Sequence, residues 1–472
     1  MIRTRFAPSP TGFMHIGNLR TALYAYLFAK SKGGQFIIRI EDTDRDRLVP
    51  GAVEVIFNTL KQAGIDYDEG PDKAVGDYPY VQSERRHIYI EHAKKLIERG
   101  GAYYCFCGKR GTEDGGLAKY DKRCKKLSKA EIDEKLANGA PYVIRQNIPT
   151  CEGVSEYTDG VYGLIRVSYK DMDDAILLKS DGMPTYNFAN VVDDYLMGIT
   201  HVLRGNEYLS STPQYNLLYD AFGWNRPEYI HLPPIMKDKE RKLSKRYGDA
   251  NFDDFVKKGY LPEAIVNYIA LLGWSPKDNT EKLSLDELKT IFGIEGLSCS
   301  PSIFDEAKLR WLNAEYIRAL TPEQFVEKAL PFLDDSKLAG LVDYTFLAGL
   351  LIPRTEIFSE IPSLIDFLAE YEEYDLELFV HQKNKTDKPF AKRALVGALS
   401  ALKGVKQWDN DTLFTTLALE AERQEIKKAQ LLWCVRIALT GRLNTPGGAT
   451  EMAVLLGKAE SIKRLKSSIS RL

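Results

Sequence analysis

The sequence predicts an α/β protein in which a Rossmann-like domain carries an inserted α+β module and is followed by an all-α C-terminal region. Three observations predict this fold class. A strand–helix–strand pattern opens the chain, short β-like runs separated by turns fill residues 101–190, and helical hydrophobic spacing dominates from about residue 321. At 472 residues the chain also exceeds what one hydrophobic core supports, so several domains are expected.

The first 40 residues predict a βαβ unit, the start of a Rossmann-like sheet. Ile2–Phe6 is a short β-like run, and a loop rich in Pro, Ser, Thr and Gly follows it. Leu19–Lys32 has helical spacing, and Gly33 and Gly34 end it as a helix C-cap does. Phe36–Ile40 is an almost continuous apolar run, which is typical of a buried parallel strand.

Later segments extend the pattern and suggest the divisions of the chain. Further helices are expected at Val53–Ala63, Arg85–Arg99 and Asp253–Leu272, and strands at Tyr142–Ile148, Gly163–Tyr169 and Ala175–Ser180. The expected divisions are the Rossmann-like domain at residues 1–100 and 191–236, the inserted module at 101–190, a connecting region at 237–320 and a helical region at 321–472.

Composition favours a soluble, cytoplasmic protein. Apolar residues make up 44% of the chain and charged residues 28%, and no apolar run approaches the roughly 20 residues needed to cross a bilayer. The first residues lack the apolar stretch of a secretory signal. A net charge of −2 argues against a general nucleic-acid binder. Basic clusters at Lys119–Lys129 and Lys237–Arg246 nevertheless suit a protein that meets polyanions on selected faces.

The loop before the first helix predicts a phosphate site. His15 and Asn18 lie three residues apart at the start of the helix, and Gly17 between them allows a ligand close to the backbone. Free N–H groups and the helix dipole make this end attractive to anions. The loop lacks the glycine fingerprint of dinucleotide enzymes, which disfavours a nicotinamide cofactor. A surface or capping role for His15 is the alternative.

A second basic segment follows the strand-like run His231–Met236. Lys242, Ser244 and Lys245 form part of a loop that could close on a phosphate and neutralise charge that develops there. Taken alone, a solvated basic turn explains this segment as well.

Together these two segments resemble the signature pair of class I aminoacyl-tRNA synthetases. His15-Ile-Gly-Asn18 corresponds to the family's His-Ile-Gly-His tetrad, and Lys242-Leu-Ser-Lys-Arg246 corresponds to its Lys-Met-Ser-Lys-Ser loop. The resemblance implies ATP, with Mg²⁺, as a substrate of the Rossmann-like catalytic domain. It further implies that a catalytic set contacts the phosphates and stabilises the pentavalent α-phosphate: His15, Lys242 and Lys245. The implied ATP-binding residues are His15, Gly17, Asn18, Lys242, Ser244 and Lys245.

Other segments resemble the glutamyl branch of this class, notably Arg3-Thr-Arg5-Phe-Ala7-Pro-Ser9 and Arg39-Ile-Glu41-Asp-Thr-Asp44. The resemblance implies transfer of L-glutamate to the 3′ end of tRNA(Glu). Two arginines suit the two carboxylates of glutamate, and Glu41 suits its ammonium; which arginine takes which carboxylate stays open. The implied glutamate-binding residues are Arg5, Ala7, Ser9, Glu41, Tyr186, Asn190 and Arg204.

Three of the six cysteines cluster in the inserted module, which the resemblance makes the acceptor-stem-binding part. Cys105, Cys107 and Cys124 could supply three ligands of a structural Zn²⁺ site. Relatives with a Cys-x-Cys, Tyr, Cys arrangement suggest Tyr120 as the fourth ligand. The alternative is three reduced thiols in an apolar cluster.

The helical C-terminal third resembles the anticodon-binding region of bacterial-type glutamyl enzymes, and Arg354 is a candidate reader of an anticodon base. The resemblance also implies a stem-contact role for residues 237–320 and a monomeric enzyme. Rivals are a glutaminyl enzyme, a shortened paralogue that lacks the anticodon-binding region, and a non-catalytic tRNA-binding relative. The sequence leaves open whether tRNA(Gln) is also charged.

Overall fold

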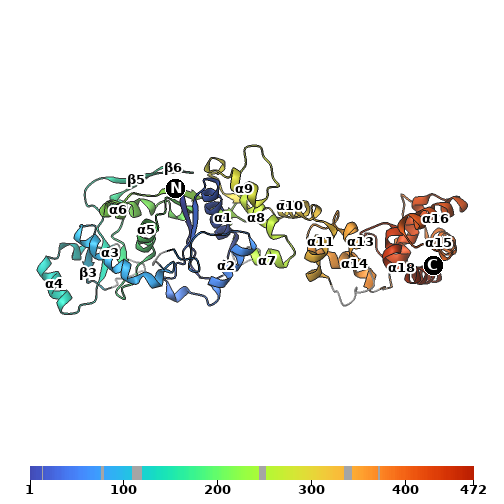
Figure 1. Ribbon diagram of the computed structural model, residues 1–472, viewed down its shortest axis with the longest axis horizontal. Coiled ribbons are helices and arrows are strands. Elements are labelled where there is room, and N and C mark those ends of the chain that lie inside the picture. Colours follow the sequence, from blue (N-terminus) through green and yellow to red (C-terminus); the bar gives the residue numbers. More distant parts are fainter. Residues whose placement is uncertain are drawn as a thin grey trace. The chain divides into compact units, whose positions relative to one another are not determined.

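The computed structural model describes residues 1–12, 14–75, 79–108, 120–243, 251–333, 343–369, 371 and 373–472. The chain divides into two compact units, residues 1–255 with 262–306, and residues 256–261 with 307–472 (Figure 1). Within the described residues, no helix has the length and apolar character needed to span a membrane.

The first unit is built on parallel strands. Its strands are β1 (Arg3–Phe6), β2 (Gln35–Ile38), β3 (Ala102–Cys105), β4 (Val143–Gln146), β5 (Val154–Asp159), β6 (Gly163–Ser168), β7 (Ile176–Leu178), β8 (His201–Gly205), β9 (Glu228–Leu232), β10 (Ile235–Met236) and β11 (Ser302–Ile303). β1 pairs with β2, and β8 pairs with β9, both in parallel. The Thr200 N–H donates to Arg3 O at 2.9 Å, which sets β8 beside β1. β3, β4 and β7 form a separate antiparallel sheet.

Some of the helices of the first unit pack against these strands, and others pack against helix α1 (Ile16–Ser31). The helices of this unit are α1, α2 (Ala52–Gln62), α3 (Arg86–Glu98), α4 (Lys129–Ala137), α5 (Tyr186–Leu196), α6 (Thr212–Phe222), α7 (Phe252–Lys257), α8 (Pro262–Ala270) and α9 (Leu285–Ile291). α1 is buried along almost its whole length, and Gly33 with φ of +63° follows its end. The βαβ unit predicted for the first 40 residues is therefore present, with a helix that begins three residues earlier than expected.

Two expectations differ from the structure. The single helix expected at Asp253–Leu272 is two helices, α7 and α8, because Gly259 has φ of +92° and Pro262 begins the second helix. The boundary expected between residues 190 and 191 falls inside α5. Strands β5 and β6, placed in the inserted module, join the sheet of β8 and β9 in the order β6-β5-β9-β8. Long-range strand pairing of this kind leaves no local signal in sequence.

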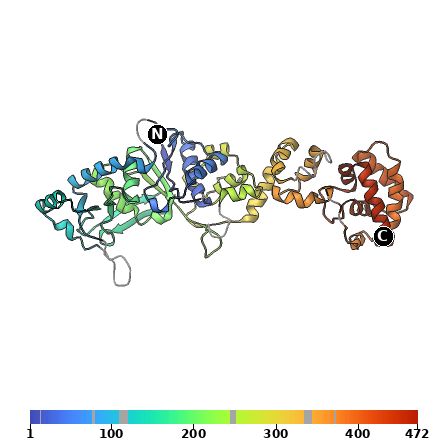
Figure 2. The same cartoon turned by 90° about the horizontal axis from the view of Figure 1, so that it is seen from below.

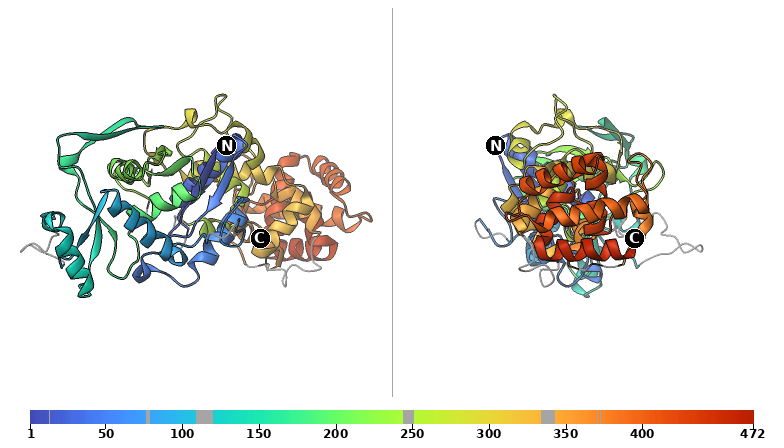
Figure 3. Two further views of the ribbon diagram at one scale, coloured as in Figure 1. Left: turned by 60° about the vertical axis from the view of Figure 1, so that its left-hand side comes forward. Right: turned by 90° about the vertical axis from the view of Figure 1, so that its right-hand side faces the viewer.

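Within the described residues, the regular elements of the second unit are all helices (Figures 2 and 3). Its helices are α10 (Glu306–Arg318), α11 (Pro322–Ala329), α13 (Tyr344–Leu351), α14 (Ile361–Ala369), α15 (Lys388–Lys403), α16 (Asn410–Arg423), α17 (Lys428–Thr440) and α18 (Ala449–Arg471). Side-chain caps begin several of them, including Asp387 at α15 and Asp409 at α16. The all-α C-terminal region predicted from sequence is confirmed.

Candidate active site

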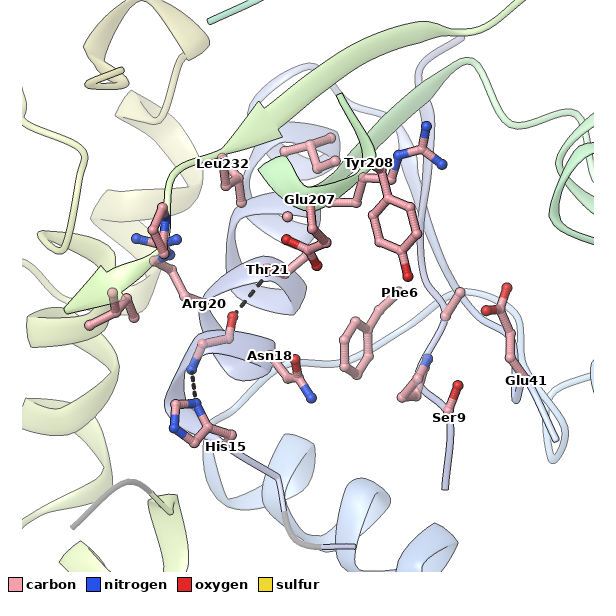
Figure 4. A pocket seen from close by; sticks show the side chains of 18 of the residues that line it. Phe6, Ser9, His15, Asn18, Arg20, Thr21, Glu41, Glu207, Tyr208 and Leu232 are labelled. Atoms are coloured by element: carbon pink, nitrogen blue, oxygen red, sulfur yellow. Dashed lines mark hydrogen bonds between the residues drawn. The ribbon is translucent and has the colours of Figure 1, made fainter. Parts of the chain in front are cut away.

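A cavity of about 570 Å³ opens where the carboxyl ends of β1, β8 and β9 meet the start of α1. Open α/β sheets bind ligands at this edge. In Figure 4, His15 and Asn18 stand at the start of α1, and Ser9 and Glu41 lie on another side of the space. The structure thus brings ten of the predicted residues together: Arg5, Ala7, Ser9, His15, Gly17, Asn18, Glu41, Tyr186, Arg204 and Lys242.

His15 acts as the N-cap of α1. Its Nδ1 accepts a hydrogen bond from the Gly17 N–H at 3.0 Å. A Cβ at Gly17 would lie 3.3 Å from His15 Nδ1, so glycine keeps this turn open. The capping role considered from sequence is therefore present, and the same histidine lines the cavity beside Asn18. The helix N-terminus favours anions at this end of the cavity.

Lys242 reaches the cavity from a hairpin that follows β10. It forms an antiparallel bridge with Met236, and the Leu243 N–H donates to Ile235 O at 3.0 Å. The side chain is exposed and lines the same cavity as the start of α1. Ser244 and Lys245, predicted to act beside it, lie outside the described residues.

A buried network of three arginines and three carboxylates adjoins the cavity: Arg5, Arg39, Arg85, Glu41, Asp193 and Asp194. Arg5 donates two hydrogen bonds to Asp194, from Nε at 3.0 Å and from Nη2 at 3.3 Å. Arg39 donates to Asp194 at 2.7 Å and to Glu41 at 3.0 Å. Arg85 Nε lies 2.8 Å from Asp193 Oδ1. Because the charges balance, the network as a whole is neutral when all six groups are ionised.

The carboxylates of this network differ in their response to burial. Burial acts to raise the pKa of Asp194, but Arg5 and Arg39 outweigh it and hold that pKa below its usual range. At Glu41 burial dominates and raises the pKa, although Arg39 opposes the shift. Glu41 therefore loses its charge at a higher pH than an exposed glutamate does.

Arg204 differs from Arg5 because its partners carry no negative charge. Its Nε donates to His231 Nε2 at 3.1 Å, and its Nη2 donates to Thr212 Oγ1 at 2.6 Å. Its guanidinium carbon lies 4.9, 5.2 and 5.4 Å from the ring centres of Tyr208, Tyr215 and Tyr229. Among the described residues no carboxylate forms an ion pair with Arg204, although its side chain is only 5% exposed. Arg204 is thus a buried cation on the cavity wall that retains its charge.

Comparison with known proteins identifies the family. Residues 1–311 match the catalytic domain of class I tRNA synthetases (E and Q), and residues 324–469 match an anticodon binding domain. A glutamate–tRNA ligase of Clostridium botulinum (strain Eklund 17B / Type B) is 54% identical over 481 residues, which cover 100% of this chain and 99% of that protein. This chain belongs to the glutamate–tRNA ligase family.

Other members of the glutamate–tRNA ligase family agree with this assignment. The enzyme of Clostridium acetobutylicum is 51% identical, with coverage of 100% of this chain and 99% of that protein. The crystal structure of a glutamate tRNA ligase from Elizabethkingia meningosepticum, in complex with its amino acid, has a TM-score of 0.89 at 32% identity and covers 100% of this chain and 99% of that chain. The predicted fold class and family are confirmed.

The cavity lining also includes polar residues that the sequence prediction omitted. Glu207 and Tyr208 line the cavity, and Figure 4 shows both side chains there. The Glu207 carboxylate lies close to Gly205, where a Cβ would displace it. The signal was present in the segment Arg204-Gly-Asn-Glu-Tyr208, in which only the arginine was assigned a role.

Asn190, by contrast, does not line the cavity within the described residues. Its Nδ2 donates to Tyr186 O at 2.7 Å, one turn earlier in α5, and the side chain is buried. Asn190 therefore stabilises the turn that carries Tyr186, which itself lines the cavity.

The predicted metal ligands of this family member converge in the module around β3. The sulfur atoms of Cys105, Cys107 and Cys124 all lie within 4.8 Å of one another. The Tyr120 hydroxyl lies 3.3 Å from Cys105 Sγ and 3.8 Å from Cys107 Sγ. Arg145 Nε donates to Cys105 Sγ at 3.4 Å. All four predicted side chains therefore face one point.

A separate pocket of about 460 Å³ lies in the second unit, within the part that matches the anticodon binding domain. Arg354 and Arg436 line it together with the segment 443–448. Arg436 donates to Leu443 O at 2.7 Å, and its guanidinium carbon lies 4.9 Å from the Trp433 ring centre. Arg354 is exposed, so its guanidinium is accessible to a ligand.

Proposed function

We propose that this protein activates L-glutamate with ATP to glutamyl-adenylate and pyrophosphate, and then transfers glutamate to the 3′-terminal adenosine of tRNA(Glu). The observation that carries the proposal is Arg204, a buried cation on the wall of a cavity that also includes a helix N-terminus suited to phosphates. A side-chain carboxylate neutralises such a cation, whereas the amide of glutamine leaves it unpaired. The ligand that fits is therefore a di-acid next to a nucleotide.

In the first step the α-carboxylate oxygen of glutamate attacks the α-phosphorus of ATP. The bond between that phosphorus and the bridging oxygen to the β-phosphate breaks, and pyrophosphate leaves with the electron pair. His15, Gly17 and Asn18 hold the phosphates at the start of α1, and Lys242 neutralises charge that develops on the α-phosphate. We propose the same phosphate-binding role for Ser244 and Lys245, because they belong to the loop that resembles the family's Lys-Met-Ser-Lys-Ser signature. Mg²⁺ accompanies the nucleotide.

Charge assigns the glutamate contacts. The ammonium and α-carboxylate of the amino acid cancel each other, so its side-chain carboxylate requires one uncompensated cation. Arg5 is already paired with Asp194, whereas the Arg204 Nη1 nitrogen has no hydrogen bond among the described residues. We therefore assign the side-chain carboxylate to Arg204 and the ammonium to Glu41. The neutral contacts come from Ala7, Ser9 and Tyr186 on the cavity wall, with Asn190 acting through Tyr186.

In the second step a ribose hydroxyl of the tRNA terminus attacks the glutamyl carbonyl. The ester forms, AMP leaves, and its phosphate accepts the proton of that hydroxyl. The module of residues 101–190 is proposed to hold the acceptor end of the tRNA, and residues 237–320 its stem. We propose that an anticodon base binds in the pocket with Arg354. The guanidinium and the backbone of segment 443–448 could form hydrogen bonds with the edge of a base.

The proposal includes a structural Zn²⁺ in the cysteine cluster. Three converging thiols and a phenol hydroxyl are a donor set of the number that a closed tetrahedral site requires. When bound, the metal would tie the end of β3 to the segment around Cys124. Arg145 supports this use, since its guanidinium, in contact with Cys105 Sγ, would offset the negative charge of a metal-bound sulfur. A monomeric, cytoplasmic enzyme completes the proposal.

The decisive experiment is aminoacylation with radiolabelled glutamate and glutamine on purified tRNA(Glu) and tRNA(Gln). Glutamate incorporation into tRNA(Glu) that depends on ATP is the expected result. Incorporation into tRNA(Gln) as well would identify a non-discriminating enzyme. If the protein binds tRNA normally but catalyses neither ATP–pyrophosphate exchange nor aminoacylation, it is a non-catalytic tRNA-binding relative.

A further inference from the structure

Asp159, His231 and Arg204 lie on three neighbouring strands and form a chain of hydrogen bonds with His231 in the middle. Arg204 on β8 and His231 on β9 are direct partners in the parallel register, and β5, which ends at Asp159, pairs with the other edge of β9. His231 Nδ1 lies 2.6 Å from Asp159 Oδ2, and its Nε2 lies 3.1 Å from Arg204 Nε. Asp159 and His231 are buried and line no part of the cavity.

The hydrogen-bond pattern fixes the protons of His231. Arg204 Nε can only donate, so His231 Nε2 must accept, and the ring proton must be on Nδ1, which donates to Asp159. Asp159 accepts in addition from the backbone N–H groups of Val161 at 2.9 Å and Tyr162 at 3.0 Å, which hold its carboxylate in place. Burial lowers the pKa of His231 and so favours the neutral ring.

A neutral imidazole in this position has a specific consequence for Arg204. A carboxylate at the same place would form an ion pair and neutralise the guanidinium, as Asp194 does for Arg5. The imidazole instead accepts one N–H bond without cancelling the charge. Thr212 Oγ1 accepts the Nη2 bond, because its own hydroxyl proton is donated to Tyr208 O at 2.7 Å. The orientation of Arg204 is therefore fixed while its charge stays available to a ligand.

We propose that His231, oriented by Asp159, is a positioning residue that holds Arg204 as an unneutralised cation and thereby sets the preference for glutamate over glutamine. This inference rests on the proposed function. It assigns roles to two residues that do not touch the substrate, and it explains why the arginine for the side-chain carboxylate is held by a histidine rather than by an acid.

The test compares His231→Gln with His231→Met in the full-length protein. Gln and Met are similar in size, but only Gln offers an oxygen that accepts from Arg204. ATP–pyrophosphate exchange in the presence of tRNA(Glu) gives KM for glutamate, KM for ATP and kcat. With His231→Met we expect KM for glutamate to rise about tenfold or more, since a hydrogen bond to a charged group is lost. KM for ATP should stay unchanged, and the glutamate-to-glutamine ratio of kcat/KM should fall. His231→Gln should stay within about threefold of the unmodified protein.

Asp159→Asn tests the orientation of the ring independently. The Asn amide would donate to His231 Nδ1, move the ring proton to Nε2 and set two donors against each other at Arg204. We expect the same rise in KM for glutamate as with His231→Met. Asp174→Asn is the matched control, because Asp174 is equally buried, accepts from the Tyr103 hydroxyl at 2.6 Å, pairs with Lys122 at 2.9 Å and does not line the cavity.

The outcomes separate the two proposals. If the unmodified protein shows no glutamate-dependent exchange, the proposed function fails. If it is active and Gln and Met at position 231 give the same KM for glutamate, or if KM for ATP rises equally, the positioning role is refuted. Should Asp159→Asn not fold, the Gln and Met pair still decides, since the backbone N–H groups continue to satisfy Asp159 in both variants.

Discussion

Replacement of Arg204 by Gln is the sharpest test of how this site selects its amino acid. Gln keeps polar hydrogen-bonding groups but removes the charge from a side chain that is 5% exposed. Loss of one partner of a buried, hydrogen-bonded charge pair costs about 2–5 kcal/mol. At about 1.4 kcal/mol for each factor of ten, kcat/KM for glutamate should fall about 30- to 4000-fold. The rate with glutamine should change much less, because an amide never paired with the charge.

The assay is tRNA-dependent ATP–pyrophosphate exchange with each amino acid in turn. Arg226→Gln is the matched control, since Arg226 forms an exposed ion pair with Asp220 and lies outside the cavity lining. The variant should fold normally, which circular dichroism checks. A kcat/KM for glutamate within about threefold of the unmodified protein, or an equal loss with both amino acids, would refute the charge argument.

Four further predictions follow from other parts of the structure. KM for glutamate should rise as pH falls toward the raised pKa of Glu41, because only the ionised carboxylate holds the ammonium; Glu41→Gln should have a high KM without this pH dependence. Asp194→Ala removes the carboxylate that pairs with Arg5 and one of the carboxylates that pair with Arg39, and it should lower the free energy of unfolding of the first unit by about 3–5 kcal/mol, measured with urea against the exposed control Asp68→Ala. Cys124→Ser should lower the zinc content measured by atomic emission and the thermal midpoint, whereas Cys299→Ser should change neither. Arg354→Ala should raise KM for tRNA(Glu) while KM for glutamate and ATP stays the same, and an unchanged KM for tRNA would contradict the anticodon assignment.

Local patterns predicted the parts of the fold that depend on neighbouring residues. The loop from Ala7 to Gly17, the helix after it and the glycines that end it are contiguous, so their spacing alone indicates a βαβ unit. The break between α7 and α8 was also local, and Gly259 followed by Pro262 gave the signal that the prediction passed over. The pairing of β5 with β9 was not predictable in this way, because Asp159 and its partner Tyr229 on β9 lie 70 positions apart in the sequence and no local feature specifies the contact.

In the site, too, the sequence predicted which residues take part but not which distant residues they pair with. Sequence resemblance identified both arginines that line the cavity, but it treated them as equivalent. The structure distinguishes them because Arg5 meets Asp194, 189 residues away, whereas Arg204 meets His231, 27 residues away. A partner's charge decides whether a buried guanidinium is already neutral, and that partner comes from a distant strand or helix.

This difference bears on how a cavity can discriminate between two amino acids of nearly equal size. Shape alone separates an amide from a carboxylate poorly, because the two groups are close in volume. A network that is neutral before the ligand arrives contributes structure and, in the proposed function, a carboxylate for the ammonium, but it does not favour an additional negative charge. Selection for the di-acid must therefore come from a cation outside that network. Arg204 meets this requirement, since histidine, threonine and aromatic rings hold it in place and leave its charge to the ligand.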